Sequence, residues 1–331
     1  MTAPLLEIDE LTVDIADVPV LRGVSLTVAA SESVGLVGES GSGKSMTLRA
    51  VARLLPEQAV AGGHVRVAGT EVLGLRGDAL RTHRRGLGMV FQDPRSAVNP
   101  VHSVGSFLLE RARDSGADLA AARARAVAVL RRMGIADAER RMAQYPFELS
   151  GGLLQRVMIA SVLMERPRLL LADEPTTALD VTTQADVLAL TEELRRESGT
   201  ALLLVTHDLD LAAAVCDRIV VMYGGRVLES APAARLVTDP VHPYTRGLLA
   251  SRPPLTHRLD EIPVVPGTPL SAADTGDGCP FASRCPVALP VCSQSLPETT
   301  TQGATQVRCH RAADVLDGSL DVELPLRQEV R

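Results

Sequence analysis

The sequence predicts an α/β fold around a mostly parallel sheet, and three segments carry this prediction. Residues 33–55 read as an apolar strand, a glycine-rich turn and a helix. Residues 167–175 and 200–208 contain short, continuously apolar runs, as expected for strands buried on both faces of a sheet. The helical pattern of residues 187–199 lies between them, so strand, helix and strand predict a parallel crossover connection.

The remaining segments predict two domains. Residues 5–28 and 63–73 read as the strands of an antiparallel β part. Residues 93–165 are rich in Arg and Ala and predict a helical insertion, with one helix over 119–134 that ends at Gly134. After residue 229 proline becomes frequent, the periodicity fades and four of the five cysteines occur. We therefore expect a first domain over 1–235 and a small cysteine-containing extension over 236–331.

The composition excludes several classes of protein. Apolar residues make up 46% of the 331 residues, which is enough for a sizeable core, but aromatic residues are only 2% and Trp is absent. The formal charge of −6 shows no basic excess, so we expect no nucleic-acid partner.

The chain also lacks the sequence features of a membrane-inserted or secreted protein. No charge-free apolar run approaches the ~18 residues of a membrane span. Glu7, Asp9 and Glu10 occupy the region where a signal peptide would be basic and then apolar. We therefore expect the protein to be made and kept in the cytosol.

A phosphate-binding loop is the strongest single motif. The segment GESGSGKS matches G-x-x-x-x-G-K-[ST] between a predicted buried strand and a predicted helix. Its residues are Gly38, Glu39, Ser40, Gly41, Ser42, Gly43, Lys44 and Ser45. In such a loop backbone N–H groups surround the phosphates, the lysine reaches the β and γ oxygens and the final hydroxyl ligates Mg²⁺. Lys44 is the only lysine in the chain, the other 33 basic residues being arginine. The sequence therefore predicts a nucleoside triphosphate site of the P-loop NTPase class.

Three polar residues end two of the buried strands. Asp173 and Glu174 follow the apolar run of 169–172, and His207 follows that of 201–205. The carboxyl ends of parallel strands form the ligand edge of an open sheet. Asp173 is a candidate Mg²⁺ ligand there, Glu174 a candidate acceptor of the proton of attacking water, and His207 could orient the water and the γ-phosphate.

The segment LSGG at 149–152 is the point at which the chain resembles the ATP-binding subunits of ABC transporters, over about residues 5–230. Gln92, in MVFQDP, matches that family's glutamine loop, which links Mg²⁺ and the γ-phosphate to the helical insertion. TALD at 177–180 matches the loop that follows the catalytic carboxylate. The resemblance implies that Glu174 is the catalytic base, His207 the switch histidine, and Gln92 a further Mg²⁺ contact.

The resemblance also implies a two-chain mechanism. Ser150, Gly151 and Gly152 would bind the γ-phosphate held by a second subunit, and Asp180 would touch that subunit. One departure concerns Leu154, which stands where relatives often have a basic residue; we expect it to remove a polar group beside the opposing nucleotide. Residues 1–44 contain no aromatic to stack on adenine, which leaves apolar contact from Ile15.

The C-terminal region narrows the resemblance. HPYTRGLL at 242–249, Pro266-Gly267 and the cysteines resemble the tail of the oligopeptide, dipeptide and nickel importers. This subclass implies two integral membrane permeases, a second related ATPase as a heterodimer, and a solute-binding protein that acts indirectly. The chain would then be peripheral on the cytoplasmic side of the plasma membrane, energising peptide import, or import of nickel or another small solute.

Four cysteines predict a metal site in this tail. Cys279, Cys285, Cys292 and Cys309 have the spacing C-x5-C-x6-C-x16-C, with Pro after the first two. Disulfides are disfavoured in the cytosol, and structural zinc sites prefer more closely spaced pairs. A four-thiolate cluster fits better, and the subclass includes members that bind [4Fe–4S] by this pattern. Zinc and metal-free thiols remain alternatives, whereas Cys216, in an apolar stretch, is expected to be a buried core residue.

Two other functions remain open at this stage. A soluble ABC ATPase of DNA repair or translation is disfavoured because residues 46–148 leave no room for a long coiled coil and the chain has one cassette. A regulator that binds ATP without hydrolysing it is disfavoured by the presence of Glu174 and His207. The sequence does not identify the solute.

Overall fold

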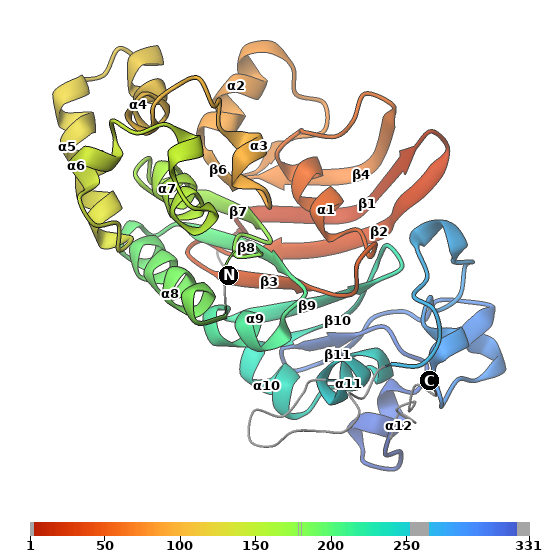
Figure 1. The fold of residues 1–331 in the computed structure, drawn as a ribbon. Coiled ribbons are helices and arrows are strands. Elements are labelled where there is room, and N and C mark those ends of the chain that lie inside the picture. The colour runs from red at the N-terminus through yellow and green to blue at the C-terminus, as the bar shows by residue number, and fades with distance from the viewer. Residues whose placement is uncertain (1–2, 178, 180, 252–264, 323–331) are drawn as a thin grey trace. The chain divides into compact units, whose positions relative to one another are not determined.

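The computed structural model describes residues 3–177, 179, 181–251 and 265–322 of the chain, shown in Figure 1. Asp180, expected to touch a second subunit, lies outside the described residues. Two compact units are present. The first comprises Met1–Thr27, Val34–Gly74 and Thr206–Arg331, and the second comprises Val28–Ser33 and Leu75–Val205.

The first unit contains a four-stranded sheet in the order β2-β1-β4-β5. Its strands are β1 (Leu6–Ile15), β2 (Val18–Val28), β4 (Ala59–Val67) and β5 (Thr70–Glu71). β1 pairs antiparallel with β4, from Leu6 opposite Val67 to Ile15 opposite Ala59. This sheet confirms the antiparallel part expected from 5–28 and 63–73.

A second group of strands in this unit carries the phosphate loop. It consists of β3 (Ser33–Val37), β9 (Arg218–Tyr223), β10 (Arg226–Pro232), β11 (Thr300–Gln302) and β12 (Thr305–Val307). β3 is buried along its whole length and pairs in parallel with β9. β10 is antiparallel to both β9 and β12, so the C-terminal extension adds strands here where periodicity had predicted none.

Short helices complete the first unit. They are α1 (Lys44–Val51), α9 (Leu209–Val215), α10 (Ala233–Thr238), α11 (Pro243–Ala250) and α12 (Ala312–Leu316). α1 ends earlier than the predicted 45–55, because Arg53 has a left-handed backbone with φ of 58° and Pro56 follows. In Figure 1 the blue C-terminal segment folds back alongside β10 and α11.

The second unit confirms the buried parallel strands and the crossover. β6 (Leu87–Val90), β7 (Leu169–Asp173) and β8 (Ala201–Thr206) pair in parallel, with β7 in the middle. α8 (Val181–Ser198) connects β7 to β8 and begins six residues before the predicted 187.

The remaining helices of this unit confirm a helical segment over 93–165. They are α2 (Gly77–Arg85), α3 (Pro94–Ala97), α4 (Val104–Asp114), α5 (Leu119–Arg132), α6 (Ala138–Arg141) and α7 (Gly151–Leu163), with a 3₁₀ turn at Pro146–Glu148. The Asp118 side chain accepts two backbone N–H bonds at the start of α5, and Gly134 follows its end with φ of 73°.

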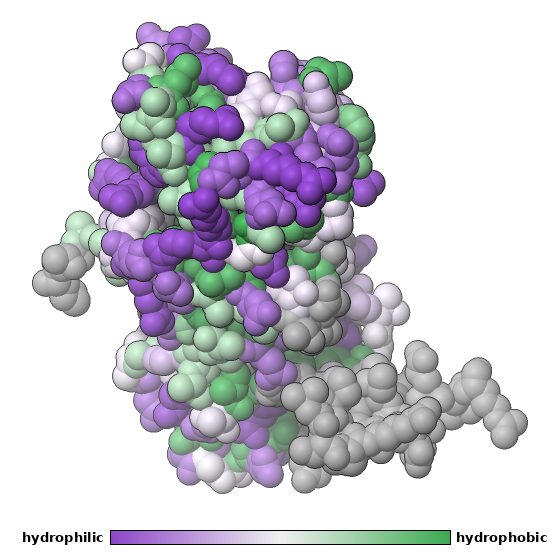
Figure 2. Space-filling view, turned by 60° about the vertical axis from the view of Figure 1, so that its left-hand side comes forward, coloured by the Kyte–Doolittle hydropathy of each residue, from purple (hydrophilic) through white to green (hydrophobic). Residues whose placement is uncertain are grey.

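The cores are mainly aliphatic, as the composition predicted, but Tyr223, Tyr244 and Phe281 are fully buried in one of them. Cys216 is a buried core residue. On the face shown in Figure 2, hydrophilic and hydrophobic side chains are mixed. Among the residues that the structure describes, no helix combines the length and apolar character of a membrane span.

Arg195 of α8 is a buried cation on which the second unit depends. It is 1% exposed and donates to the backbone carbonyls of Ser31 and Thr200 at 2.7 and 2.8 Å. Glu192 balances its charge with hydrogen bonds at 2.5 and 2.7 Å.

We predict that Arg195→Met lowers the free energy of unfolding by about 3 kcal/mol, because it removes the buried cation bound to Glu192 and the side-chain donor to two backbone carbonyls, of which that of Thr200 is buried. Urea unfolding of the full chain, followed by circular dichroism, measures this. Arg196→Met is the matched control, since Arg196 pairs with the same Glu192 but its side chain is 66% exposed. Equal losses in the two variants would contradict the assignment.

Candidate nucleotide-binding site and four-cysteine site

The phosphate loop follows β3, and its two turns depend on glycine. A Cβ at Gly38 would lie 2.1 Å from the carbonyl oxygen of Met222 on β9. Gly43 has a left-handed φ of 98°, and a Cβ there would lie 2.4 Å from Leu21. The loop is therefore packed against β9 and β2 so closely that no larger side chain fits at these two positions.

Lys44 begins α1 and lies inside the loop. Its Nζ donates to the carbonyls of Gly38 and Glu39 at 2.7 and 2.9 Å and to the Ser42 hydroxyl at 3.3 Å. Lys44 is 6% exposed, whereas Ser40 and Gly41 lie exposed at the tip. The loop thus surrounds its own cation, and a phosphate would replace these neutral acceptors with charged ones.

In the second unit, strand ends bring Gln92 and Glu174 together. Gln92 follows β6 and Glu174 follows β7, its parallel neighbour. The Gln92 amide donates to a Glu174 carboxylate oxygen at 2.9 Å, and the Thr177 hydroxyl donates to the same oxygen at 3.1 Å. Asp173, the last residue of β7, is 5% exposed.

His207 follows β8 and is exposed. The next residue, Asp208, caps α9 by accepting the Leu211 N–H at 3.0 Å, and its own N–H donates to Thr206 Oγ1. His207 is therefore placed between a strand end and a capped helix start.

The signature segment forms the start of α7. Ser150 is its N-cap and accepts the Leu153 N–H at 3.3 Å, while Gly151 and Gly152 form the first turn. A Cβ at Gly152 would lie 2.9 Å from Leu179. The helix predicted to start near Leu153 begins two residues earlier.

The structure places Leu154 in the core. Leu154 is 1% exposed and is buried together with Val157 and Met158 of the same helix. The expected loss of a polar group beside an opposing nucleotide stays a prediction.

Sequence reasoning missed the role of Gln155. Its side chain is fully buried, and its Nε2 donates to the backbone carbonyl of Pro175, directly after Glu174. Gln155 thereby fixes the start of α7 to the loop that follows β7. The only sequence signal is a glutamine one turn after Gly151.

The four cysteines of the extension line one hollow, together with His242, Val287 and His310 among others. All are free thiols. Burial, reinforced by the neighbouring cysteines, raises the pKa of Cys279 to about 12 and that of Cys309 to about 11, and the pKa of Cys285 is also raised. The predicted gathering of these residues is confirmed, and without a bound cation these three stay protonated at neutral pH.

A site for one metal ion is not formed by these side chains. Over the described ranges, no group of three or more His, Cys, Asp or Glu residues is placed to hold a metal ion. The cluster, zinc and metal-free alternatives therefore all stay predictions at this point.

The segment 242–244 links this hollow to the rest of the first unit. Glu229 of β10 is buried and accepts the N–H groups of Val241 and His242 at 2.7 and 3.0 Å. His242 Nδ1 accepts the Tyr244 N–H at 3.0 Å, and its Nε2 lies 4.0 Å from Cys279 Sγ. Burial lowers the pKa of His242 to about 3, so the ring is neutral and carries its proton on Nε2.

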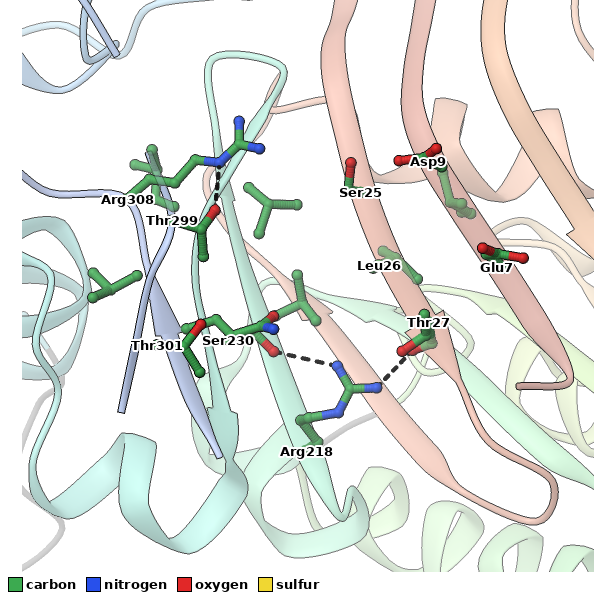
Figure 3. Close-up of a pocket in the computed structure, with 16 residues that line it drawn as sticks. Glu7, Asp9, Ser25, Leu26, Thr27, Arg218, Ser230, Thr299, Thr301 and Arg308 are labelled. Carbon is green, nitrogen blue, oxygen red and sulfur yellow. Dashed lines mark hydrogen bonds between the residues drawn. The ribbon is translucent and has the colours of Figure 1, made fainter. Parts of the chain in front are cut away.

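A separate pocket of about 390 Å³ lies between β1 and β2 on one side and β9, β10 and β12 on the other (Figure 3). Hydrogen bonds connect its lining residues, and the one from Arg218 to Thr27 joins the two walls. Arg218 donates to the Ser230 hydroxyl and the Thr27 carbonyl, and Arg308 donates to Thr299. The pocket is thus a seam between strands and the C-terminal hairpin, and it contains none of the predicted nucleotide residues.

Two family models match the chain. The ABC transporter model matches residues 21–177, and the model of the oligopeptide/dipeptide transporter C-terminal region matches residues 228–292.

Full-length relatives agree with both models. The oligopeptide transport ATP-binding protein OppD of Salmonella typhimurium is 43% identical over 299 residues, covering 88% of this chain and 89% of the relative. The probable D,D-dipeptide transport ATP-binding protein DdpD of Escherichia coli is 42% identical over 317 residues, with 93% and 96% covered.

Solved structures confirm the cassette fold. The subunit cbiO1 from Clostridium perfringens, part of the ABC transporter complex cbiONQ, has a TM-score of 0.63 at 27% identity, covering 71% of this chain and 91% of that one. A dimer of the cassette MJ0796 bound to ADP and Pi has a TM-score of 0.60 at 30% identity, covering 69% and 98%. The phosphate loop, the signature turn and the matched C-terminal region together place this chain in the family of ATP-binding proteins of oligopeptide and dipeptide ABC transporters.

Proposed function

We propose that the chain is the ATP-hydrolysing subunit that energises peptide import through a membrane permease. The observation that carries this proposal is the presence of a phosphate loop and an ABC signature in one chain with the peptide-transporter C-terminal region. The relatives' names specify oligopeptides and D,D-dipeptides, which favours a peptide over nickel or another small solute.

The nucleotide residues take the following roles in this proposal. The backbone of Gly38–Ser45 and the Lys44 ammonium bind the phosphates of ATP. Ser45, Asp173 and Gln92 would hold Mg²⁺, whose charge neutralises the phosphate oxygens. Asp173 fits this role because its side chain is buried at a strand end, where a bound cation would compensate its charge.

Glu174 is assigned as the catalytic base. Gln92 and Thr177 both donate to one of its carboxylate oxygens. As water attacks the γ-phosphorus, the bond to the ADP oxygen breaks and the carboxylate accepts the proton of the water. His207 would orient the γ-phosphate and the water.

A second subunit completes the site in this proposal. Ser150, Gly151 and Gly152 present a hydroxyl and helix-start N–H groups of the kind that bind anions. The anion would be the γ-phosphate of ATP bound to the partner, for which we favour a second related ATPase over another copy of this chain. We also propose that Asp180 contacts that partner.

The membrane partners would be two permeases, with a solute-binding protein acting through them. Tyr145 and Phe147, just before the signature, stack at 5.6 Å and are 42% and 74% exposed. An exposed aromatic pair suits contact with a protein partner. This arrangement would make the chain peripheral on the cytoplasmic side of the plasma membrane. We also propose that the ATP-binding domain ends near residue 235, where the C-terminal extension begins.

The cysteine hollow is proposed to hold a [4Fe–4S] cluster through Cys279, Cys285, Cys292 and Cys309. Four cysteines line one hollow, Cys292 buried and the other three partly buried, and they could supply the four thiolates that such a cluster needs. The cluster would supply the positive charge that stabilises the thiolates.

We predict that Glu174→Gln lowers kcat for ATP hydrolysis by about 10²–10⁴-fold and preserves ATP binding, because the amide keeps the shape but cannot accept the proton. Steady-state hydrolysis and ATP binding by the full chain measure the two effects. Glu193→Gln, on the exposed side of α8, is the control. Hydrolysis at the parental rate in Glu174→Gln would show that another group is the base.

We predict that anaerobically purified protein contains about four irons and four acid-labile sulfides, and that Cys285→Ser loses most of both together with the brown colour. Cys216→Ser is the control, since Cys216 is a cysteine outside the hollow. Zinc in place of iron, or unchanged iron in Cys285→Ser, would refute this assignment.

We predict that the tagged chain, purified from detergent-solubilised membranes, brings with it two multi-span permeases and a second ATPase, identified by mass spectrometry. Phe147→Ser should lower permease recovery roughly five-fold, as expected for loss of an aromatic anchor worth about 1 kcal/mol. Val291→Ser, a partly exposed apolar residue of the extension, is the control. Recovery only from the soluble fraction, with ribosomal or repair proteins, would favour a non-transport ATPase.

A further inference from the structure

Two side chains of the C-terminal extension hold Glu39, the second residue of the phosphate loop. Arg284 donates to both carboxylate oxygens of Glu39, at 2.7 and 3.1 Å. The Tyr244 hydroxyl accepts the backbone N–H of Glu39 at 2.9 Å. These contacts join residues more than 200 positions apart, and all of them lie within the first unit.

Arg284 is itself held rigidly. Its side chain is 4% exposed, and it donates to the carbonyls of Val265 and Pro266 and to the Tyr223 hydroxyl, at 3.0, 2.8 and 3.0 Å. Its guanidinium lies 5.6 Å from the centre of the Tyr223 ring.

Glu39 passes this constraint on to the nucleotide-binding lysine. Its side chain is bound by Arg284 and its N–H by Tyr244, while its carbonyl accepts Lys44 Nζ at 2.9 Å. A carboxylate in the loop that binds a triphosphate would repel that anion unless a cation neutralised it. Arg284 supplies this cation and fixes the carboxylate in one direction.

We propose that Arg284 is a positioning residue for ATP binding. It acts through Glu39, neutralising the carboxylate and holding the first turn of the phosphate loop in its binding shape, with Tyr244 as the second anchor. ATP affinity of the cassette therefore depends on a residue of the C-terminal extension. Arginine suits this role because its planar fork binds a carboxylate with two hydrogen bonds while its other N–H groups bind carbonyls.

The test is ATP binding and hydrolysis by the full chain with Mg²⁺ present. Arg284→Gln should raise the Kd and KM for ATP about ten-fold and change kcat less than about two-fold, because the unpaired Glu39 carboxylate opposes the phosphates before hydrolysis begins. Arg246→Gln is the matched control. It breaks another ion pair of the extension, to Asp321 at 3.0 Å, which leaves the phosphate loop untouched.

A second variant separates positioning from a merely structural role. In Arg284→Gln/Glu39→Gln the carboxylate is absent, and Kd should return to within about three-fold of the parent. If Arg284 only stabilised the fold of the extension, the second substitution would restore nothing. Thermal unfolding of each variant records the structural loss independently.

Either of two results would overturn the proposal: a parental Kd in Arg284→Gln, or a double variant as weak as the single one. Arg284→Lys covers the case in which the glutamine variant does not fold. Lysine keeps the charge but cannot make the two parallel hydrogen bonds of arginine. The Kd for ATP of Arg284→Lys should therefore rise about three-fold, and adding Glu39→Gln should reverse this rise. A parental Kd in Arg284→Lys would again overturn the proposal.

Discussion

The buried ammonium of Lys44 is the constraint on which the nucleotide site depends. A charge that is 6% exposed must be surrounded by acceptors, and here two loop carbonyls and a hydroxyl provide them. Carbonyls point at the ammonium only if the loop turns sharply, and glycine at positions 38 and 43 permits those turns against β9 and β2. The loop thereby fixes β2, β9, the start of α1 and the Lys44 ammonium relative to one another.

Sequence reasoning was most informative where the candidate functional residues are consecutive in the chain. The phosphate loop is contiguous, and Glu174 directly follows a short apolar strand, whereas Gln92 was proposed from the family resemblance and is found after β6. The sequence did not show the orientation of side chains that could point either to the core or to the surface. Leu154 follows two glycines at the start of α7, and only the packing of that helix shows that it faces the core. The β11–β12 hairpin was missed because strands of three residues carry no readable alternation.

The spacing of the cysteines predicts that they share a site but not how that site is built. Four cysteines over about thirty residues predict a shared site, and the structure brings them to one hollow. Spacing could not show that His242 closes this hollow beside Cys279, or that buried Glu229 fixes His242 by its backbone N–H. The raised pKa values of Cys279 and Cys309 come first from burial and then from the neighbouring cysteines, and the extent of burial cannot be read from the spacing.

The pairing of Glu39 with Arg284 explains why the extension and the phosphate loop share one compact unit. An acidic residue inside a phosphate-binding loop needs a cation close by that does not itself occupy the phosphate site. Lys44 cannot serve, because its ammonium is committed to the loop carbonyls and to the incoming phosphate. Arg284 of the extension supplies this cation, and its guanidinium also donates to the Tyr223 hydroxyl of β9. The same 3₁₀ turn that presents Arg284 is followed directly by Cys285, so the geometry of the cysteine hollow and that of the loop anchor are set by one short segment.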